Sequence, residues 1–140
     1  MNSSWCSLTT GSDINRRNAD KCGKQRLLMR IAIAAGEAAW DKAGCPQCHG
    51  ASGEGGTGGE FPAGPSLRTT KLDRAALRET ISCGLPATEM PAWLDGAYTQ
   101  RPCYSFPVGP PPAGTTLTPV LDANEIDALV DYLTATIVGK

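Results

Sequence analysis

Large aromatic side chains are scarce in this sequence, which has three Trp, three Tyr and two Phe among 140 residues. A chain of this length corresponds to one domain of ordinary size, whose core normally depends on large apolar side chains. We therefore expect another group to fill part of the interior. Histidine is scarcer still, because His49 is the only one. Any site that needs two imidazoles from one chain is excluded.

A long apolar run is also missing. The most apolar stretch, residues 27–35, is interrupted by Arg30 and is too short to cross a bilayer as a helix. Basic residues precede it and small residues end it, as in a secretion signal, but the interruption and the polar stretch before it fit poorly. A remnant targeting segment and an ordinary extension both stay open. Residues 1–35 are predicted to form a poorly ordered arm, and residues 36–140 one domain.

Charge is unevenly divided along the chain, although the formal net charge is only −1. Six basic and two acidic residues precede Gly36, whereas seven basic and twelve acidic residues follow. An acidic body argues against nucleic acid as a partner, because nucleic-acid-binding domains concentrate Lys and Arg on one face. A surface of this kind suits weak association with a protein partner.

Two helices are predicted in the first part of the domain. Residues 36–48 include several alanines, which are good helix formers. Asp73 is a suitable N-cap for a second helix that ends near Gly84. In that helix Leu77 and Ile81 lie on one face, as expected of a helix with one buried side.

The clearest helix is the last one. Its apolar residues recur at spacings of three and four, and Asp122 or Asn124 caps it. These apolar residues are Ile126, Leu129, Val130, Leu133 and Ile137. Gly-rich and Pro-rich loops are predicted over 50–64 and 85–120, and no stretch alternates as a strand would. The fold class is therefore predicted to be all-α.

The motif Cys45-Pro46-Gln47-Cys48-His49 carries the most specific chemistry. Two thiols at this spacing can each add to a vinyl group of haem, and the adjacent His then lies under the iron as an axial ligand. A thioredoxin-type dithiol would require a preceding strand, whereas the residues before Cys45 favour a helix. A zinc site would require two further ligands at a suitable spacing. The motif therefore indicates one covalently attached haem c.

A second axial ligand must come from a residue other than His. Among the three Met residues, Met1 is terminal and Met29 lies in the predicted arm. Met90 lies in a loop after the second helix and precedes Pro91, which can hold its thioether rigidly. The alternative is that Met90 only packs in the core. We predict His49 and Met90 as the metal ligands, and a thioether ligand raises the potential of haem.

Four separated motifs, in this order, resemble the class I cytochrome c family of mitochondria and bacteria over residues 36–138. The first is Gly36 and Trp40 ahead of the Cys45–His49 motif; in the family these residues pack on the C-terminal helix, here at Leu129 and Tyr132. The resemblance implies three to five helices wrapped around one haem c. The family's short last helix matches residues 125–133.

The other two motifs concern the axial ligands. The segment Gly64-Pro65-Ser66-Leu67 resembles the family motif in which the Pro carbonyl accepts a hydrogen bond from the proximal His. This contact would orient the ring of His49 and raise its basicity. Residues 81–91 resemble the helix and loop that supply the Met ligand. Trp93 could donate a hydrogen bond to a haem propionate or could simply belong to the core.

The resemblance implies a function in electron transfer between redox proteins rather than catalysis by the chain alone. The chain would be a soluble carrier or the electron-accepting cytochrome subunit of a periplasmic dehydrogenase, and an oxidase or another cytochrome would be the acceptor. Gln47, Ala51 and residues 91–92 are candidates for the rim that meets a partner. A periplasmic location is expected, since covalent haem attachment normally follows export. The alternative is a haem-based sensor or small-ligand enzyme with a displaceable Met90.

Two features depart from the family pattern. Residues 94–120 form a long insertion before the last helix, which could be a docking surface or merely a tolerated loop. Four cysteines lie outside the haem motif. Cys83 and Cys103 bracket Met90, and a disulfide between them would tie the insertion to the ligand loop. Cys6 and Cys22 could pair in the same way.

Overall fold

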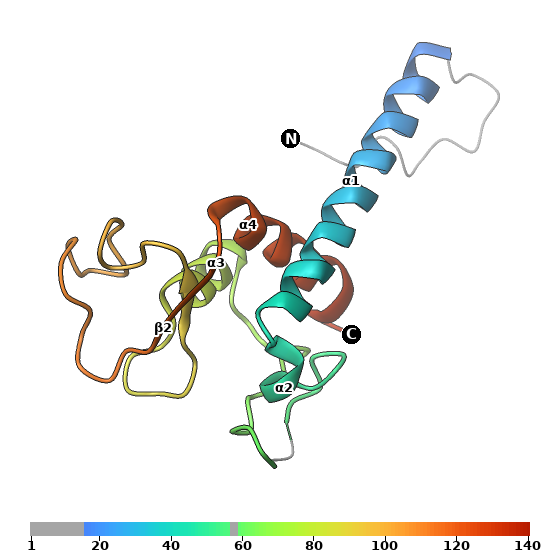
Figure 1. The fold of residues 1–140 in the computed structure, drawn as a ribbon. Coiled ribbons are helices and arrows are strands. Elements are labelled where there is room, and N and C mark those ends of the chain that lie inside the picture. The colour runs from blue at the N-terminus through green and yellow to red at the C-terminus, as the bar shows by residue number, and fades with distance from the viewer. Residues whose placement is uncertain (1–15, 57–58) are drawn as a thin grey trace.

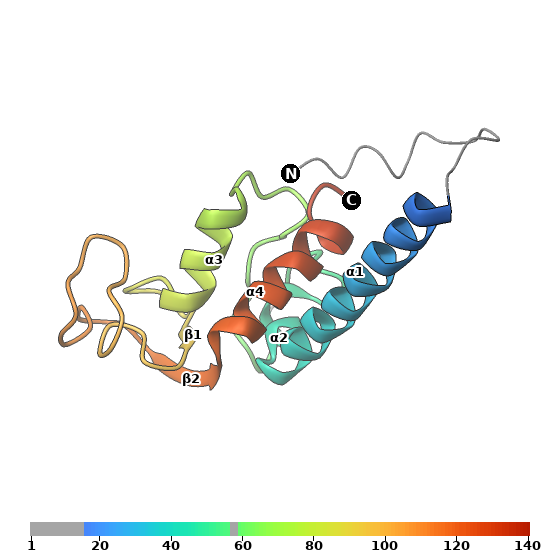
Figure 2. The same cartoon turned by 90° about the horizontal axis from the view of Figure 1, so that it is seen from above.

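The computed structural model describes residues 16–56 and 59–140. Along the chain the elements are α1 (Arg16–Lys42), α2 (Cys45–His49), α3 (Arg74–Cys83), β1 (Ala92–Leu94), β2 (Leu117–Leu121) and α4 (Ala123–Tyr132), followed by a π-helical turn over Leu133–Ile137. Helix α4 lies between α1 and α3, the short helix α2 follows the end of α1, and the two strands lie on the side of the body away from the start of α1 (Figures 1 and 2). The helices predicted after Asp73 and after Asp122 are both present.

The predicted irregular arm is wrong for residues 16–35, which belong to α1. This helix starts at Arg16, and residues 24–35 consist of Lys, Gln, Arg, Leu, Met, Ile and Ala, most of which are good helix formers. Gly36 lies inside the helix instead of starting it. The proposed domain boundary at 35/36 therefore falls within a continuous helix. The chain before residue 16 lies outside the described residues.

The all-α expectation is incomplete, because β1 and β2 form a small parallel sheet. Ala92 pairs with Leu117 and Leu94 with Leu121, with an irregularity between the two pairs. Neither strand could be predicted from the sequence pattern. One has only three residues, and the other contains Pro119 and is largely exposed, so neither alternates clearly.

The core centres on the crossing of α1 and α4, which lie side by side (Figure 2). Gly36 permits the close approach, because a Cβ on it would lie 2.1 Å from the carbonyl oxygen of Ala128. One turn later Trp40 packs on Tyr132, with ring centroids 6.3 Å apart, and Leu129 is fully buried. The expected contact between these two helices is confirmed.

Polar side chains cap the N-termini of α3 and α4 and join α1 to α4. Asp122 caps α4 in a capping box with Glu125, which settles the choice between Asp122 and Asn124. Lys42 Nζ lies 2.6 Å from Glu125 Oε1 and so joins the end of α1 to the start of α4. Asp73 caps α3 by accepting from the Ala76 N–H at 2.8 Å.

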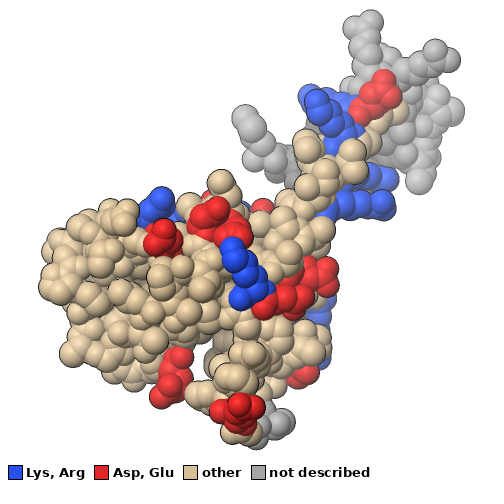
Figure 3. Space-filling view, in the orientation of Figure 1, with Lys and Arg blue, Asp and Glu red and all other residues tan. Residues whose placement is uncertain are grey.

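The N-terminal part of α1 projects beyond the body (Figure 1). Its side chains Leu27, Leu28, Met29 and Ile31 are 56–60% exposed. Lys and Arg side chains gather along this projection, while most of the acidic side chains visible in the same view lie on the body (Figure 3). Among the described residues, no helix combines the length and apolar character needed to cross a bilayer.

Candidate functional site

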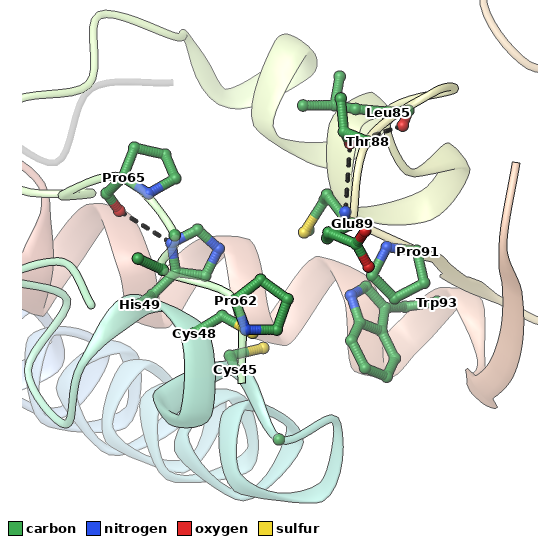
Figure 4. A pocket seen from close by; sticks show the side chains of 14 residues that line it. Cys45, Cys48, His49, Pro62, Pro65, Leu85, Thr88, Glu89, Pro91 and Trp93 are labelled. Atoms are coloured by element: carbon green, nitrogen blue, oxygen red, sulfur yellow. Dashed lines mark hydrogen bonds between the residues drawn. The ribbon is translucent and has the colours of Figure 1, made fainter. Parts of the chain in front are cut away.

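A cavity of about 320 Å³ lies between α2 and the segment that follows α3. Its lining is mostly apolar, as is usual for small-molecule and cofactor sites. Figure 4 shows His49 and Pro65 on one side, Thr88, Pro91 and Trp93 on the opposite side, and the two cysteines between them. The lining residues are Gly44, Cys45, Cys48, His49, Pro62, Ala63, Gly64, Pro65, Leu85, Thr88, Glu89, Met90, Pro91 and Trp93.

Helix α2 brings both cysteines of the motif to this cavity. It begins after Gly44, whose φ of 71° makes a sharp turn out of α1, and Pro46 occupies its first turn. Cys45 and Cys48 are one turn apart and both thiols are free. Burial raises the pKa of the Cys45 thiol to about 12.

The ring of His49 is held by Pro65. His49 Nδ1 lies 2.9 Å from the Pro65 carbonyl oxygen, so the ring donates from Nδ1 and its Nε2 keeps a free lone pair. This is the contact expected from the resemblance. A hydrogen bond of this kind fixes the tautomer and the orientation of a ligating imidazole.

The Gly-rich loop folds back over the end of α2. The Gly64 N–H donates to the Cys48 carbonyl and the Gly55 N–H to the His49 carbonyl, each at 2.7 Å. Gly64 has no room for a side chain, because a Cβ would lie 2.8 Å from His49 Nδ1. Inside the loop, hydrogen bonds donated by the Glu54 and Ser52 N–H groups and the Ser52 hydroxyl lower the pKa of the exposed Glu54. The loop is thus held by hydrogen bonds to the end of α2 and by others within the loop.

Met90 lines the same cavity from the loop between α3 and β1. The Leu85 N–H donates to the Met90 carbonyl at 3.0 Å. The Thr88 hydroxyl donates to the Leu85 carbonyl at 2.7 Å and accepts from the Met90 N–H at 3.2 Å. Met29, by contrast, is 60% exposed on α1, and Met1 lies outside the described residues.

Trp93 also lines the cavity, and its Nε1 is buried without a hydrogen-bond partner. An unpaired buried donor costs free energy, about 1–3 kcal/mol, so a polar group in the cavity would be favoured beside it. The apolar space is thus surrounded by five functional groups. They are two thiols, one imidazole nitrogen with a free lone pair, one thioether and the Trp93 N–H donor. The set fits haem c, whose porphyrin is apolar and whose propionates are hydrogen-bond acceptors.

Other expectations for this region have mixed outcomes. Gln47 and Ala51 are exposed, but Ala92 is only 1% exposed and cannot belong to a docking rim, because it is covered within β1. Cys83 and Cys103 form a disulfide with a Cα–Cα distance of 5.7 Å. The other suggested pair includes Cys6, which lies outside the described residues.

Sequence reasoning missed the apolar walls Pro62, Ala63 and Leu85. These residues lie in loops, where apolar positions have no period that would identify them as buried. Only their closeness in the chain to Pro65 and Met90 could have suggested them. Among the described residues, no group of three or more His, Cys, Asp or Glu side chains is arranged to hold a bare metal ion.

Comparison with family models gives one match. Residues 31–101, half of the chain, match the family described as cytochrome C oxidase, cbb3-type, subunit III. The matched segment contains the cysteine motif, Pro65, Met90 and Trp93. Searches of curated proteins and of solved structures found no match.

Proposed function

The chain belongs to this family of class I-type monohaem cytochrome c domains and carries covalently bound haem c, and from that premise we propose which residues hold it. Cys45 and Cys48 would hold the haem through two thioether bonds, each thiol adding its sulfur and its hydrogen across one vinyl group. His49 Nε2 and the Met90 thioether would bind the iron. Residues 36–140 contain all of these groups and would form the haem-carrying domain, with the earlier part of α1 as a continuous helical extension of it.

The observation that carries this assignment is the common cavity. His49, oriented by the Pro65 carbonyl at 2.9 Å, and Met90 line the same apolar space as the two thiols. Haem c supplies reversible one-electron transfer between Fe(III) and Fe(II). The chain's residues contribute a fixed imidazole, a thioether that favours Fe(II), and apolar walls that limit contact with water.

The cytochrome domain functions in electron transfer and, by itself, is not expected to be an enzyme. If His49 and Met90 both bind the iron, a substrate would have to displace one of them to reach it. We propose that the chain accepts electrons from a dehydrogenase and passes them to an oxidase or another cytochrome, as a free carrier or as a subunit. Gln47, inside the cysteine motif, and Ala51, just after it, are exposed and are suitable positions for a small, transient interface.

We place this activity in the periplasm. The disulfide between Cys83 and Cys103 supports this location, because disulfides persist mainly in oxidising compartments.

A spectroscopic comparison of the wild type and Met90→Ala tests the ligand assignment. The wild type should retain haem after denaturation and show the near-infrared charge-transfer band of thioether ligation in the oxidised state. Met90→Ala should keep the covalent haem and lose the band. Rapid carbon monoxide binding to the reduced wild type, with no such band, would support the sensor alternative instead.

Co-purification at native expression distinguishes the two forms of the electron-transfer proposal. A stable complex with one dehydrogenase would identify a subunit, whereas a monomeric cytochrome that exchanges electrons with several partners would identify a carrier. An isolated protein that neither donates to nor accepts from any redox protein would contradict both.

A further inference from the structure

The insertion between β1 and β2, residues 95–116, contacts the Met90 loop at four points. Its chain leaves the body after β1, forms the outer loops drawn in yellow to orange at the left of Figure 1, and returns at β2. Each contact involves a residue within seven positions of Met90. The insertion is therefore more than a tolerated loop on the surface.

Two contacts lie before Met90, at the end of α3. Cys83 is bonded to Cys103, and both residues are buried, at 3% and 1% exposed. Next to this disulfide, the Tyr104 hydroxyl donates to the Gly84 carbonyl at 2.5 Å. Burial raises the pKa of Tyr104, so the hydroxyl remains a donor across the physiological range.

Gly84 is the point at which the chain turns towards Met90. Its φ of 65° and ψ of −171° are readily adopted only by Gly, and a Cβ there would lie 2.5 Å from the Ala92 nitrogen. The start of the Met90 loop, at Gly84, therefore packs against its end, at Pro91 and Ala92. A donor that holds the Gly84 carbonyl restrains both ends of the loop.

The other two contacts flank Met90 closely. The Ala87 N–H donates to the Gly114 carbonyl at 2.9 Å, and the Ala92 N–H donates to the Thr116 carbonyl at 2.8 Å. Ala87 has a φ of 60°, which is unfavourable for a residue with a Cβ and is maintained only where neighbours restrain it. Gly114 approaches Ala87 so closely that a Cβ on Gly114 would lie 3.1 Å from the Ala87 backbone.

We propose that residues 95–116 act as a brace that positions the Met90 thioether, with Tyr104 and the Cys83–Cys103 disulfide as its positioning residues. The inference rests on the proposed role of Met90 as an iron ligand. A ligand loop of this kind could leave the iron by a local opening, and the brace raises the free energy of the opened state. Its loss should weaken the thioether bond without removing haem.

Carbon monoxide binding to the reduced holoprotein measures this opening, because carbon monoxide must displace Met90. Tyr104→Phe removes only the hydroxyl, and it should raise the apparent affinity for carbon monoxide about fivefold, the change expected for one neutral hydrogen bond. Replacing both cysteines by Ala should raise it more than tenfold. In both variants the near-infrared thioether band should weaken and the midpoint potential should fall, because thioether ligation favours Fe(II).

Two controls separate positioning from loss of stability. Val108→Ala changes an exposed side chain of the same insertion. Ile126→Val removes a methyl group from the fully buried start of α4, away from the loop, at a cost in global stability similar to that of Tyr104→Phe. Both should keep the wild-type carbon monoxide affinity, band and potential.

The outcomes distinguish the brace from the ligand assignment. A wild type without the thioether band would overturn the role of Met90. A wild type with the band, together with a Tyr104→Phe variant that binds carbon monoxide no better than the two controls, would overturn the brace alone. If the double cysteine variant does not fold, Tyr104→Phe still decides the question.

Discussion

Gly64 lies directly against the imidazole of His49. A Cβ on Gly64 would lie 2.8 Å from Nδ1, the atom that donates to the Pro65 carbonyl, and 2.9 Å from the Cys48 carbonyl oxygen. The glycine and the proline of the Gly64-Pro65 pair thus have separate functions. Pro65 supplies the acceptor, and Gly64 leaves the space in which the ring can reach it.

Gly64→Ala should displace the ring and weaken its hydrogen bond to Pro65. The imidazole then becomes a weaker donor to Fe(III), so the midpoint potential should rise by about 40 mV, the equivalent of about 1 kcal/mol in a one-electron couple. Gly109→Ala is the control, because a Cβ at Gly109 would meet nothing within 4 Å. Equal potentials in the two variants would show that the contact with Gly64 does not influence His49.

Trp93→Phe tests whether the unpaired Nε1 serves a haem propionate. If it donates to that carboxylate, the variant should lose about 1.5–3 kcal/mol of stability beyond the packing change and its potential should fall, because uncompensated negative charge favours Fe(III). If it has no partner in the holoprotein, removing the donor should relieve an unfavourable burial. Urea denaturation of the holoprotein distinguishes the two cases, because stability should fall in the first and rise in the second. Potentiometry then shows whether the potential falls, as the first case requires.

The helices after Asp73 and Asp122 could be predicted because their signals are local. A capping side chain precedes each of them, and apolar residues such as Leu77, Ile126 and Leu129 repeat at helical spacing. The helix predicted to start at Gly36 in fact starts at Arg16, and no capping residue or proline near Gly36 marks a boundary there. The role of Gly36 depends on α4, and a contact with a distant helix leaves no trace in the local sequence.

The part of the candidate site that could be predicted consists of residues that belong to recognisable sequence motifs. Cys45, Cys48, His49 and Met90 follow from residue type and spacing, and Pro65 from the resemblance. The contacts of Tyr104 with Gly84 and of Gly114 with Ala87 could not be predicted, because each involves a backbone group at least twenty residues away in the chain. Backbone carbonyls and amides are the same at every position, so only the folded chain reveals such pairs.

Gly36→Ala should destabilise the holoprotein by about 1–3 kcal/mol. The added Cβ would overlap the Ala128 carbonyl and the Tyr132 Cβ, so α1 and α4 must separate, and this loss outweighs the helix propensity gained. Gly23→Ala in the same helix is the matched control, since a Cβ there meets nothing within 4 Å. Chemical denaturation should show a lower midpoint for Gly36→Ala only. Equal midpoints would show that the helix crossing tolerates a methyl group.

The contact between Lys42 and Glu125 should make stability depend on acid pH. The hydrogen bond from Lys42, followed by the bond from the Asp122 N–H, lowers the pKa of Glu125 below its ordinary value. The folded state therefore binds the proton less tightly than the unfolded state. The stabilisation is complete above about pH 4.5 and is lost as the pH falls through the lower pKa of the folded state.

Glu125→Gln should accordingly be less stable at neutral pH, by about 0.5 kcal/mol because the ion pair is largely exposed, and the difference from the wild type should shrink below pH 4.5. Denaturation of the two holoproteins from neutral pH to below pH 4.5 measures the difference in stability directly. The titration of acidic groups present in both proteins cancels in this difference. Salt screens the attraction between Lys42 and Glu125, so the difference in stability at neutral pH should become smaller at high ionic strength. A difference that stays constant from pH 7 to pH 3 would mean that Glu125 contributes through its shape in the capping box and not through its charge.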